Sequence, residues 1–200
     1  MKYWLFTSLV VVSALFFSQQ KTVDGFTSIE IDGPVVVELV AAETNGIEAL
    51  EEADLVEWEQ NGNSLVVMGR YKRGRDAARV RIQVADLQML ETTSSVVVEG
   101  QGEFATRRME ITANAQSIIT MDIDVEQLDL EADAQSIVTL NGQADAFTLE
   151  ANAQSIINAG GVRCGTIDAE ANHQSVVTIN SGDAKVNSST KNQSIINGVD

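Results

Sequence analysis

The sequence predicts an all-β fold, a parallel β-helix or β-solenoid with coils of about 19 residues and a β-rich N-terminal cap. Three observations support this prediction. A motif recurs at a fixed interval through the second half of the chain, and apolar and polar side chains alternate along each copy. The copies are also rich in Val, Ile and Thr, the 200 residues hold a single proline, and the apolar positions lack helical spacing.

The repeated motif is Ala-Asn-Ala-Gln-Ser followed by two β-branched residues. Three copies are nearly identical, two later copies diverge, and a degenerate copy precedes them at residues 92–97. The five copies occupy residues 113–119, 132–138, 151–157, 171–177 and 190–196. Their glutamines, at intervals of 19, 19, 20 and 19 residues, are Gln116, Gln135, Gln154, Gln174 and Gln193. We therefore expect one copy per coil.

The segment before each motif alternates with the period of a strand. Apolar residues fall at every second position over residues 128–134, 147–153 and 167–173, with acidic or polar residues between them. One face of each strand is thus predicted to be buried, with Leu130 and Leu149 pointing inward and His173 in an inward column of alanines. Successive coils pair in parallel about 4.8 Å apart, so equivalent residues form columns along the axis.

Glycines are predicted to mark the corners of the coils. The pairs Asn141-Gly142, Gly160-Gly161 and Ser181-Gly182 follow the repeated glutamine by six to eight residues. Glycine permits the positive φ of a sharp turn, so each coil is expected to hold two or three short strands. The last copy is more polar, with Ser188, Thr190 and Asn192, as expected for a terminal cap over an open sheet edge.

Residues 21–91 lack the repeat but remain β-rich. Strand-like segments occur at residues 29–31, 35–40, 65–68 and 80–84, with turn signals at 32–34 and 61–63. We interpret them as an N-terminal cap and first coils, continuous with the regular repeats of residues 92–200. Residues 46–58 are acidic and are left open as a loop or an extended edge.

The N-terminus predicts a secretory signal peptide over residues 1–20. Lys2 precedes an apolar run at residues 3–17, which ends in three polar residues. The run is shorter than the roughly 20 residues that cross a bilayer, so we expect no permanent membrane span, with an uncleaved anchor as the alternative. Residues 21–200 are expected to form one domain in the periplasm, on the outer-membrane surface or in the medium.

The charge of the chain limits its partners. The formal net charge is −16, and it becomes −17 without residues 1–20 because only Lys2 is lost. Such a charge excludes nucleic acid as a natural partner. A lone basic segment with a glycine at position 74 stands out against this background, and we expect a solvated loop. The alternative is a contact with anionic glycan, lipopolysaccharide or an acidic protein patch, through Arg70, Tyr71, Lys72, Arg73 and Arg75.

A column of acids is the other charged feature. Glu131, Glu150 and Glu170 are equivalent in successive coils, and we expect a solvated acidic face, with weak Ca²⁺ contacts as the alternative. One histidine and one cysteine give no zinc ligand set, and no base recurs beside the repeated serines. No cofactor and no catalytic set are predicted. Cys164 is expected to be a small buried apolar residue, with a reactive or intermolecularly paired thiol as the alternative.

The order of segments, from Phe26–Gly33 through 35–37, 63–67 and 80–84 to Leu87, resembles the family described as putative auto-transporter adhesin, head GIN domain. The resemblance covers nearly all of residues 21–200. It implies a right-handed parallel β-helix in an exported protein, without an established enzymatic reaction. The chain departs from the family at the corners, where it has Ala-Asn-Ala-Gln-Ser in place of a Ser-Gly-rich turn.

These observations favour a non-catalytic, adhesin-like envelope or surface module that binds polysaccharide or a protein partner. The repeated Asn, Gln and Ser side chains, and above all the five glutamines, would offer regular hydrogen bonds to a repetitive ligand. Two alternatives stay open. One is a polysaccharide-cleaving β-helix enzyme, because carboxylates are plentiful. The other is a structural module that pairs through its β-edges; the sequence does not determine an oligomeric state.

Overall fold

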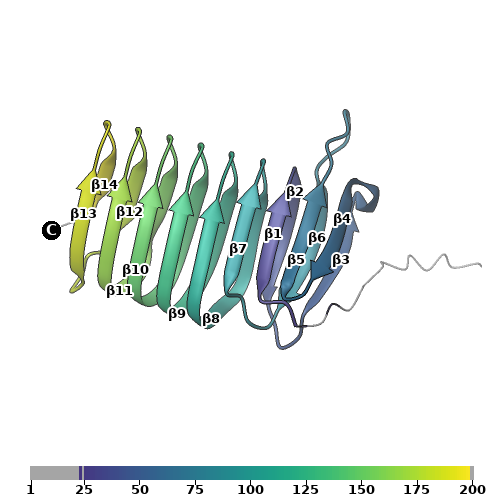
Figure 1. Cartoon of the computed structure of the whole chain (residues 1–200), viewed down its shortest axis with the longest axis horizontal. Coiled ribbons are helices and arrows are strands. Elements are labelled where there is room, and N and C mark those ends of the chain that lie inside the picture. The colour runs from purple at the N-terminus through teal and green to yellow at the C-terminus, as the bar shows by residue number, and fades with distance from the viewer. Residues whose placement is uncertain (1–22, 24, 199–200) are drawn as a thin grey trace, which may run out of the picture.

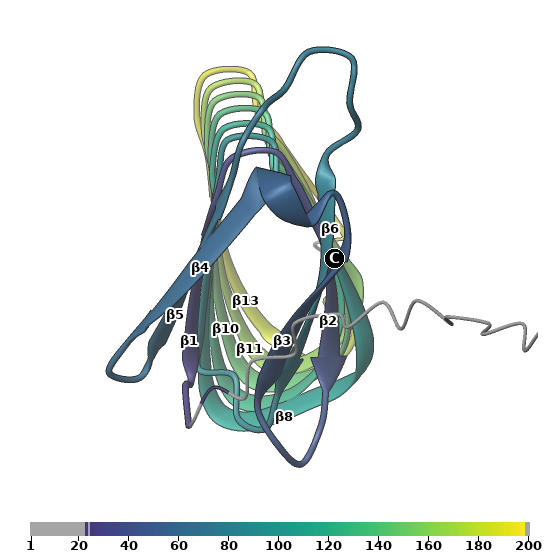
Figure 2. The ribbon, with the colours of Figure 1, turned by 90° about the vertical axis from the view of Figure 1, so that its right-hand side faces the viewer.

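The computed structural model describes residue 23 and residues 25–198, and the predicted signal peptide lies outside them. The chain is a right-handed parallel β-solenoid (Figures 1 and 2). In Figure 1 each regular coil rises along the front, crosses to the back at a sharp corner and descends there, and the next coil lies to its left. Fourteen strands belong to one continuous sheet. The strands are β1 Ser28–Asp32, β2 Val35–Ala41, β3 Gly46–Glu51, β4 Val56–Asn61, β5 Ser64–Gly69, β6 Ala78–Val84, β7 Met89–Thr93, β8 Val97–Ala113, β9 Ile118–Ala132, β10 Ile137–Ala151, β11 Ile156–Ala171, β12 Val176–Ile179, β13 Lys185–Thr190 and β14 Ile195–Asn197.

The solenoid has two broad faces. The first face is built by β4, β5, β1, β7, the C-terminal parts of β8 to β11, and β13. The second face is built by β3, β6, β2, the N-terminal parts of β8 to β11, β12 and β14. The sharp corners join the first face to the second, and a gradual bend within each long strand returns the chain to the first face (Figure 2).

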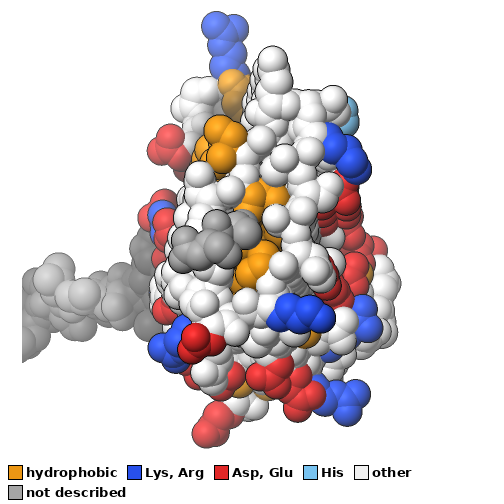
Figure 3. Space-filling model, turned by 90° about the vertical axis from the view of Figure 1, so that its left-hand side faces the viewer, with side chains coloured by type: hydrophobic (Ala, Val, Ile, Leu, Met, Phe, Trp, Pro, Cys, Tyr) orange, Lys and Arg blue, Asp and Glu red, His pale blue; other side chains and the backbone are white. Residues whose placement is uncertain are grey.

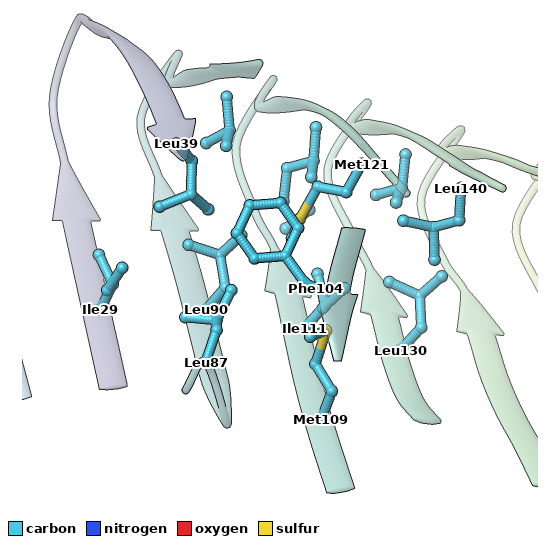
Figure 4. Close-up of a cluster of buried hydrophobic side chains, with 14 of the residues drawn as sticks. Ile29, Leu39, Leu87, Leu90, Phe104, Met109, Ile111, Met121, Leu130 and Leu140 are labelled. Carbon is cyan, nitrogen blue, oxygen red and sulfur yellow. The ribbon is translucent and has the colours of Figure 1, made fainter. Parts of the chain in front are cut away.

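Apolar side chains from both faces fill the space between them (Figure 4). On the first face, Leu130 pairs in register with Ile111 on one side and with Leu149 on the other. Leu130 is 4% exposed and Leu149 is 1% exposed, so both point inward as predicted. The stacking of one such residue per coil gives a continuous core from Val23 to Ile179.

The sharp corners lie at the repeated motif, and the prediction of glycine corners is wrong. In the second copy, Ala134 and Gln135 have φ of 52° and 67°, and the equivalent residues of the other copies do the same. Gly142 also has a positive φ, but it lies inside β10 at the gradual bend. The coils from β8 to β11 therefore consist of single strands of 15 to 17 residues and not of several short ones.

The corner also ends the inward alternation earlier than predicted. Ala132 is fully buried, but Ala134 is exposed because two successive left-handed residues redirect the chain. His173 occupies the same corner position one coil further on from Ala153, with φ of 53°, and it is exposed. The prediction of an inward histidine is therefore wrong.

The N-terminal region forms the predicted cap but in an unexpected order. The β1–β2 coil lies between the β5–β6 coil and the β7–β8 coil. The outermost strands, β3 and β4, pair antiparallel with β6 and β5. The segment 46–58 is thus mostly an extended edge, interrupted by a 3-10 turn at Ala53–Leu55. Within the described part of the chain, no helix is long and apolar enough to span a membrane.

Candidate functional site

The repeated motif builds a hydrogen-bonded corner. The backbone N–H of Gln116 donates to the carbonyl of Ala134 one coil on at 3.0 Å, and Gln135 and Gln154 repeat this bond with Ala153 and His173. Left-handed backbone costs roughly 1 kcal/mol or more in a residue other than glycine. Because the corners stack in register, these bonds offset that cost in every coil.

The serine that follows the glutamine lies inside the corner, and in two copies its hydroxyl binds the corner backbone. Ser117, Ser136, Ser155 and Ser175 are fully buried. The Ser117 hydroxyl donates to the Asn114 carbonyl at 2.6 Å and the Ser175 hydroxyl donates to that of Asn172 at the same distance. A surface serine ladder is therefore excluded for these four coils. The motif recurs because each of its residues has a role in the corner, and the sequence alone did not separate that role from ligand binding.

The five glutamines form an amide ladder along the outside of the corners. Each side-chain Nε2 donates to the Oε1 of the next glutamine, at 3.1, 3.0, 3.1 and 3.3 Å from Gln116 to Gln193. The side chains remain exposed. An amide in such a ladder still has a second N–H and a second lone pair for a ligand.

Two further columns run beside the glutamines on the second face. An aliphatic column points outward two residues after each glutamine, with Ile118 at 41% and Ile195 at 52% exposure. A column of threonine and asparagine follows two residues later. We call the glutamines and these two columns the uncharged strip; the added residues are Ile118, Ile137, Ile156, Val176, Ile195, Thr120, Thr139, Asn158, Thr178 and Asn197.

The uncharged strip ends where the second face becomes charged. Beyond Thr120 the column continues with Glu99 and Glu38. Glu38 accepts hydrogen bonds from Arg81 at 2.8 Å and from Arg79 at 3.0 Å, and Arg81 also pairs with Glu48. Hydrogen bonds from Arg81 first, and from Arg79 second, lower the pKa of Glu38. This ion-pair cluster stabilises the N-terminal coils and lies outside the uncharged strip.

The predicted basic segment is a loop between β5 and β6 that rises past the row of corners at its N-terminal end (Figures 1 and 2). Acids pair with most of its cations: Arg70 with Glu57, and Arg75 with Asp54 and Glu52. Lys72 lies 3.8 Å from Asp54. Tyr71 is 78% exposed and Arg73 is also exposed. The structure thus places the basic loop and the Gln ladder on the same edge of the molecule.

The acidic column lies on the outside of the first face, in register as predicted. Partial burial raises the pKa of Glu131, and the neighbouring carboxylates of Glu150, Asp133 and Glu110 raise it further. Lys191 binds Glu170 and lowers the pKa of that carboxyl. Among the described residues no group of three or more His, Cys, Asp or Glu is arranged to hold a metal ion.

A shallow groove of about 620 Å³ follows the gradual bend, opposite the corners. Its floor is the column Thr106, Val125, Ala144 and Cys164. Cys164 is half-buried and packs against the core, and burial raises the pKa of its thiol to about 11. A thiol with this pKa stays protonated at neutral pH, which agrees with the apolar role predicted for it.

The columns of the uncharged strip next to the glutamines were not predicted as site residues. Their signal was present in the sequence, because every repeated glutamine is followed at the second position by Ile or Val and at the fourth by Thr or Asn. Alternation alone cannot say which of two apolar neighbours, such as Ile118 and Ile119, points inward. The corner geometry decides it, with Ile119 fully buried and Ile118 outside.

Comparisons with known proteins agree with this architecture. The family model described as "Putative auto-transporter adhesin, head GIN domain" matches residues 25–197. A "putative adhesin" from Bacteroides fragilis NCTC 9343 superimposes with a TM-score of 0.74 at 14% identity, covering 87% of this chain and 84% of that one. A "putative adhesin" from Parabacteroides merdae ATCC 43184 gives 0.68 at 14% identity, covering 90% and 94%.

A third solved structure is similar as well. It is named "Putative lipid binding protein", from Parabacteroides distasonis ATCC 8503, and it gives a TM-score of 0.62 at 12% identity, covering 90% of this chain and 94% of that one. At these identities the likeness concerns the fold alone. No curated protein matches the sequence.

Proposed function

Because this chain belongs to the auto-transporter adhesin head GIN domain family, we propose that it is a non-catalytic adhesin-like module that binds a neutral polysaccharide along its uncharged strip. The observation that carries the proposal is the strip itself. It places amide, aliphatic and hydroxyl groups in three parallel columns over five coils, on a protein whose net charge is −16.

The chemistry of the strip suits a sugar chain. Amides and hydroxyls exchange hydrogen bonds with sugar hydroxyls, and the aliphatic column offers contact to C–H groups. Each contact is weak, but equivalent groups recur about every 4.8 Å, so several units of a repetitive ligand bind at once. The acidic first face disfavours an anionic polymer there.

The basic loop extends this surface at one end. Tyr71 offers an exposed ring, and Arg73 an exposed cation, beside the row of corners. A polymer that follows the Gln ladder toward the N-terminal coils would meet both side chains. We therefore assign Tyr71 and Arg73 to the ligand contact, and Arg70, Lys72 and Arg75 to holding the loop against β4 and the 3-10 turn through their acidic partners.

The placement of the carboxylates supports a binding role over a cleaving one. Glycosidases hold two carboxyl groups on opposite sides of a bound sugar. Here Glu131, Glu150 and Glu170 lie in one row on an open face, about one coil apart, and amide groups of Asn152 and Asn172 donate to the latter two. The family name and the N-terminal sequence support export, to the periplasm, the outer-membrane surface or the medium.

The experiment is a retention assay. Protein without residues 1–20, whose removal leaves every described contact in place, is passed over a panel of immobilised neutral and anionic bacterial polysaccharides, and the flow-through is assayed for new chain ends. Retention on neutral polymers without new ends is the expected result. New chain ends would show an enzyme instead. Absence of retention, or retention only on anionic polymers or on lipid vesicles run in parallel, contradicts the proposed ligand.

A further inference from the structure

The two ends of the solenoid are built differently. The N-terminal end is covered by β3 and β4, which run antiparallel to their neighbours and bring the partly buried Trp58 against the core. The C-terminal end is the last coil itself, β13 and β14. Within the described residues, β13 pairs only with β11 and β14 only with β12. A row of backbone N–H and C=O groups on each strand is therefore left without a sheet partner.

The core is also uncovered at this end. Ile196 continues an inward column whose members Ile157 and Val177 are fully buried, yet Ile196 is only partly buried. Val186 ends the column of Phe147 and Ile167 in the same way. Figure 3 looks onto this end and shows apolar side chains in the middle, between the two faces.

Charge sets this end apart from the rest of the molecule. Between Asp183 and Gly198 there is no acid, while Lys185 and Lys191 are both present. Figure 3 shows acidic side chains along the right side, the bottom and part of the left of this view, around the apolar middle. The first face is acidic, and like charges disfavour the approach of a second copy there. Among residues 184–198 of the last coil, two copies can therefore meet without carboxylates facing one another.

We propose that two copies of this chain pair end to end through β13 and β14. A two-fold axis perpendicular to the solenoid axis brings the two uncovered cores together. It also reverses the strand direction, so the free edges meet antiparallel, which is a favourable pairing for sheet edges. Both copies use the same strands in this contact, so it is self-complementary and joins two chains.

The same coil explains why the pairing is modest in strength. Its inward positions Ser188 and Thr190 are polar, and a lysine lies on the edge, which are features that limit edge pairing. The contact involves one coil per copy, so it falls in the class of small interfaces. We therefore expect a reversible dimer with a dissociation constant on the order of tens of micromolar.

Sedimentation equilibrium from 1 to 500 μM tests the pairing. The wild-type mass is expected to rise from one chain to two, and Ser188→Asp, which places a carboxylate at the centre of the contact, is expected to weaken association at least tenfold. The matched control is Ser189→Asp, on the same strand but pointing outward on the first face, which should leave association unchanged. Monomer throughout, masses beyond two chains, or equal effects of the two variants would overturn the proposal.

Hydrogen exchange gives a second measurement that does not depend on a variant folding. The backbone amides of β13 and β14 should exchange at least several-fold more slowly at 500 μM than at 1 μM, while those of β10 should not change. Equal exchange at both concentrations contradicts the dimer. Neither Ser188 nor Ser189 belongs to the uncharged strip, so the polysaccharide assay and the association assay can fail independently.

Discussion

Glu38 is the carboxylate most closely held by cations on the second face. Its side chain is 14% exposed and accepts hydrogen bonds from Arg79 and Arg81. These bonds lower its pKa, so the stability that they provide is fully present above the unfolded-state value of about 4.3 and is lost as the pH falls through the folded value.

Glu38→Gln is therefore expected to lower the free energy of unfolding by about 1 kcal/mol at pH 7, a value typical of a partly exposed network. The difference between wild type and variant should shrink as the pH falls below about 4.3 and through the lowered pKa of Glu38, because protonation then removes the charge that the arginines bind. Urea denaturation at pH 7 and at pH 3 measures this. An equal difference at the two pH values would show that lost packing, and not the ion pairs, causes the destabilisation.

Cys164 should react slowly in the folded protein. With a pKa of about 11, only a small fraction of its thiol is ionised at pH 8, compared with an unfolded cysteine near pKa 8.5. A thiol reagent at pH 8 is expected to label the native protein roughly 200-fold more slowly than the urea-unfolded protein. The native rate should keep rising up to about pH 11. A native rate that levels off near pH 9 would contradict the raised pKa.

At the residue scale, alternation correctly predicted the inward leucines but not the corner. Leu130 and Leu149 lie in regular strand, where a period of two determines the side. His173 lies two residues past Ala171, in step with the alternation, and nothing in its residue type signals a left-handed backbone. The stacked corners stabilise that conformation, and such stacking is a property of several coils together.

The gradual bend of β10 and β11 is the element whose glycines can be compared directly. A Cβ on Gly142 would lie 2.0 Å from the Ile123 carbonyl oxygen, and the φ there is 111°. A Cβ on Gly160 would lie 3.5 Å from the Thr178 methyl group, an ordinary contact, and its φ lies outside the left-handed region. Gly160 lies two residues before Val162, the register partner of Gly142, so both glycines belong to the bend but have different environments.

Gly142→Ala is expected to cost about 2 kcal/mol or more, because backbone must shift and the side chain disfavours positive φ. Gly160→Ala should be neutral or stabilise by up to about 0.5 kcal/mol, since alanine restricts the unfolded chain. Chemical denaturation of the two variants provides the comparison. A similar loss of stability in both variants would contradict this explanation. It would mean that the bend requires the flexibility of glycine and that the close approach of the Ile123 carbonyl to Gly142 is not what destabilises the variant.

At the element scale, the regular coils followed from the sequence and the order of the cap did not. The interval between glutamines gives the coil length and the register of β8 to β12. No repeat connects β1 and β2 to their neighbours, so their place between β5–β6 and β7–β8 depends on contacts far apart in the chain. At the outer edge, the turn signal at 61–63 marks the antiparallel hairpin of β4 and β5, but no local signal predicts that β3 pairs with β6.

The whole molecule is a slab with unlike sides. The first face carries the column of Glu131, Glu150 and Glu170. On the second face, the uncharged strip holds no acidic or basic residue. The net charge favours solubility, and its uneven placement leaves one side for contact with a neutral ligand. The sequence predicted the glutamine column of this surface. It did not predict that the aliphatic and Thr/Asn columns point outward, because the corner geometry determines which residues after the glutamine are exposed.

The most direct test of this account compares two threonines of β10. Thr139 lies in the uncharged strip between Thr120 and Asn158, and Thr148 points outward from the first face. Both are replaced by lysine, and the binding of each variant is measured on the polysaccharide that retains the wild type most strongly. We predict that Thr139→Lys weakens binding at least tenfold and that Thr148→Lys leaves it unchanged. Equal binding by the two variants, or loss only with Thr148→Lys, would contradict the assignment of ligand binding to the strip.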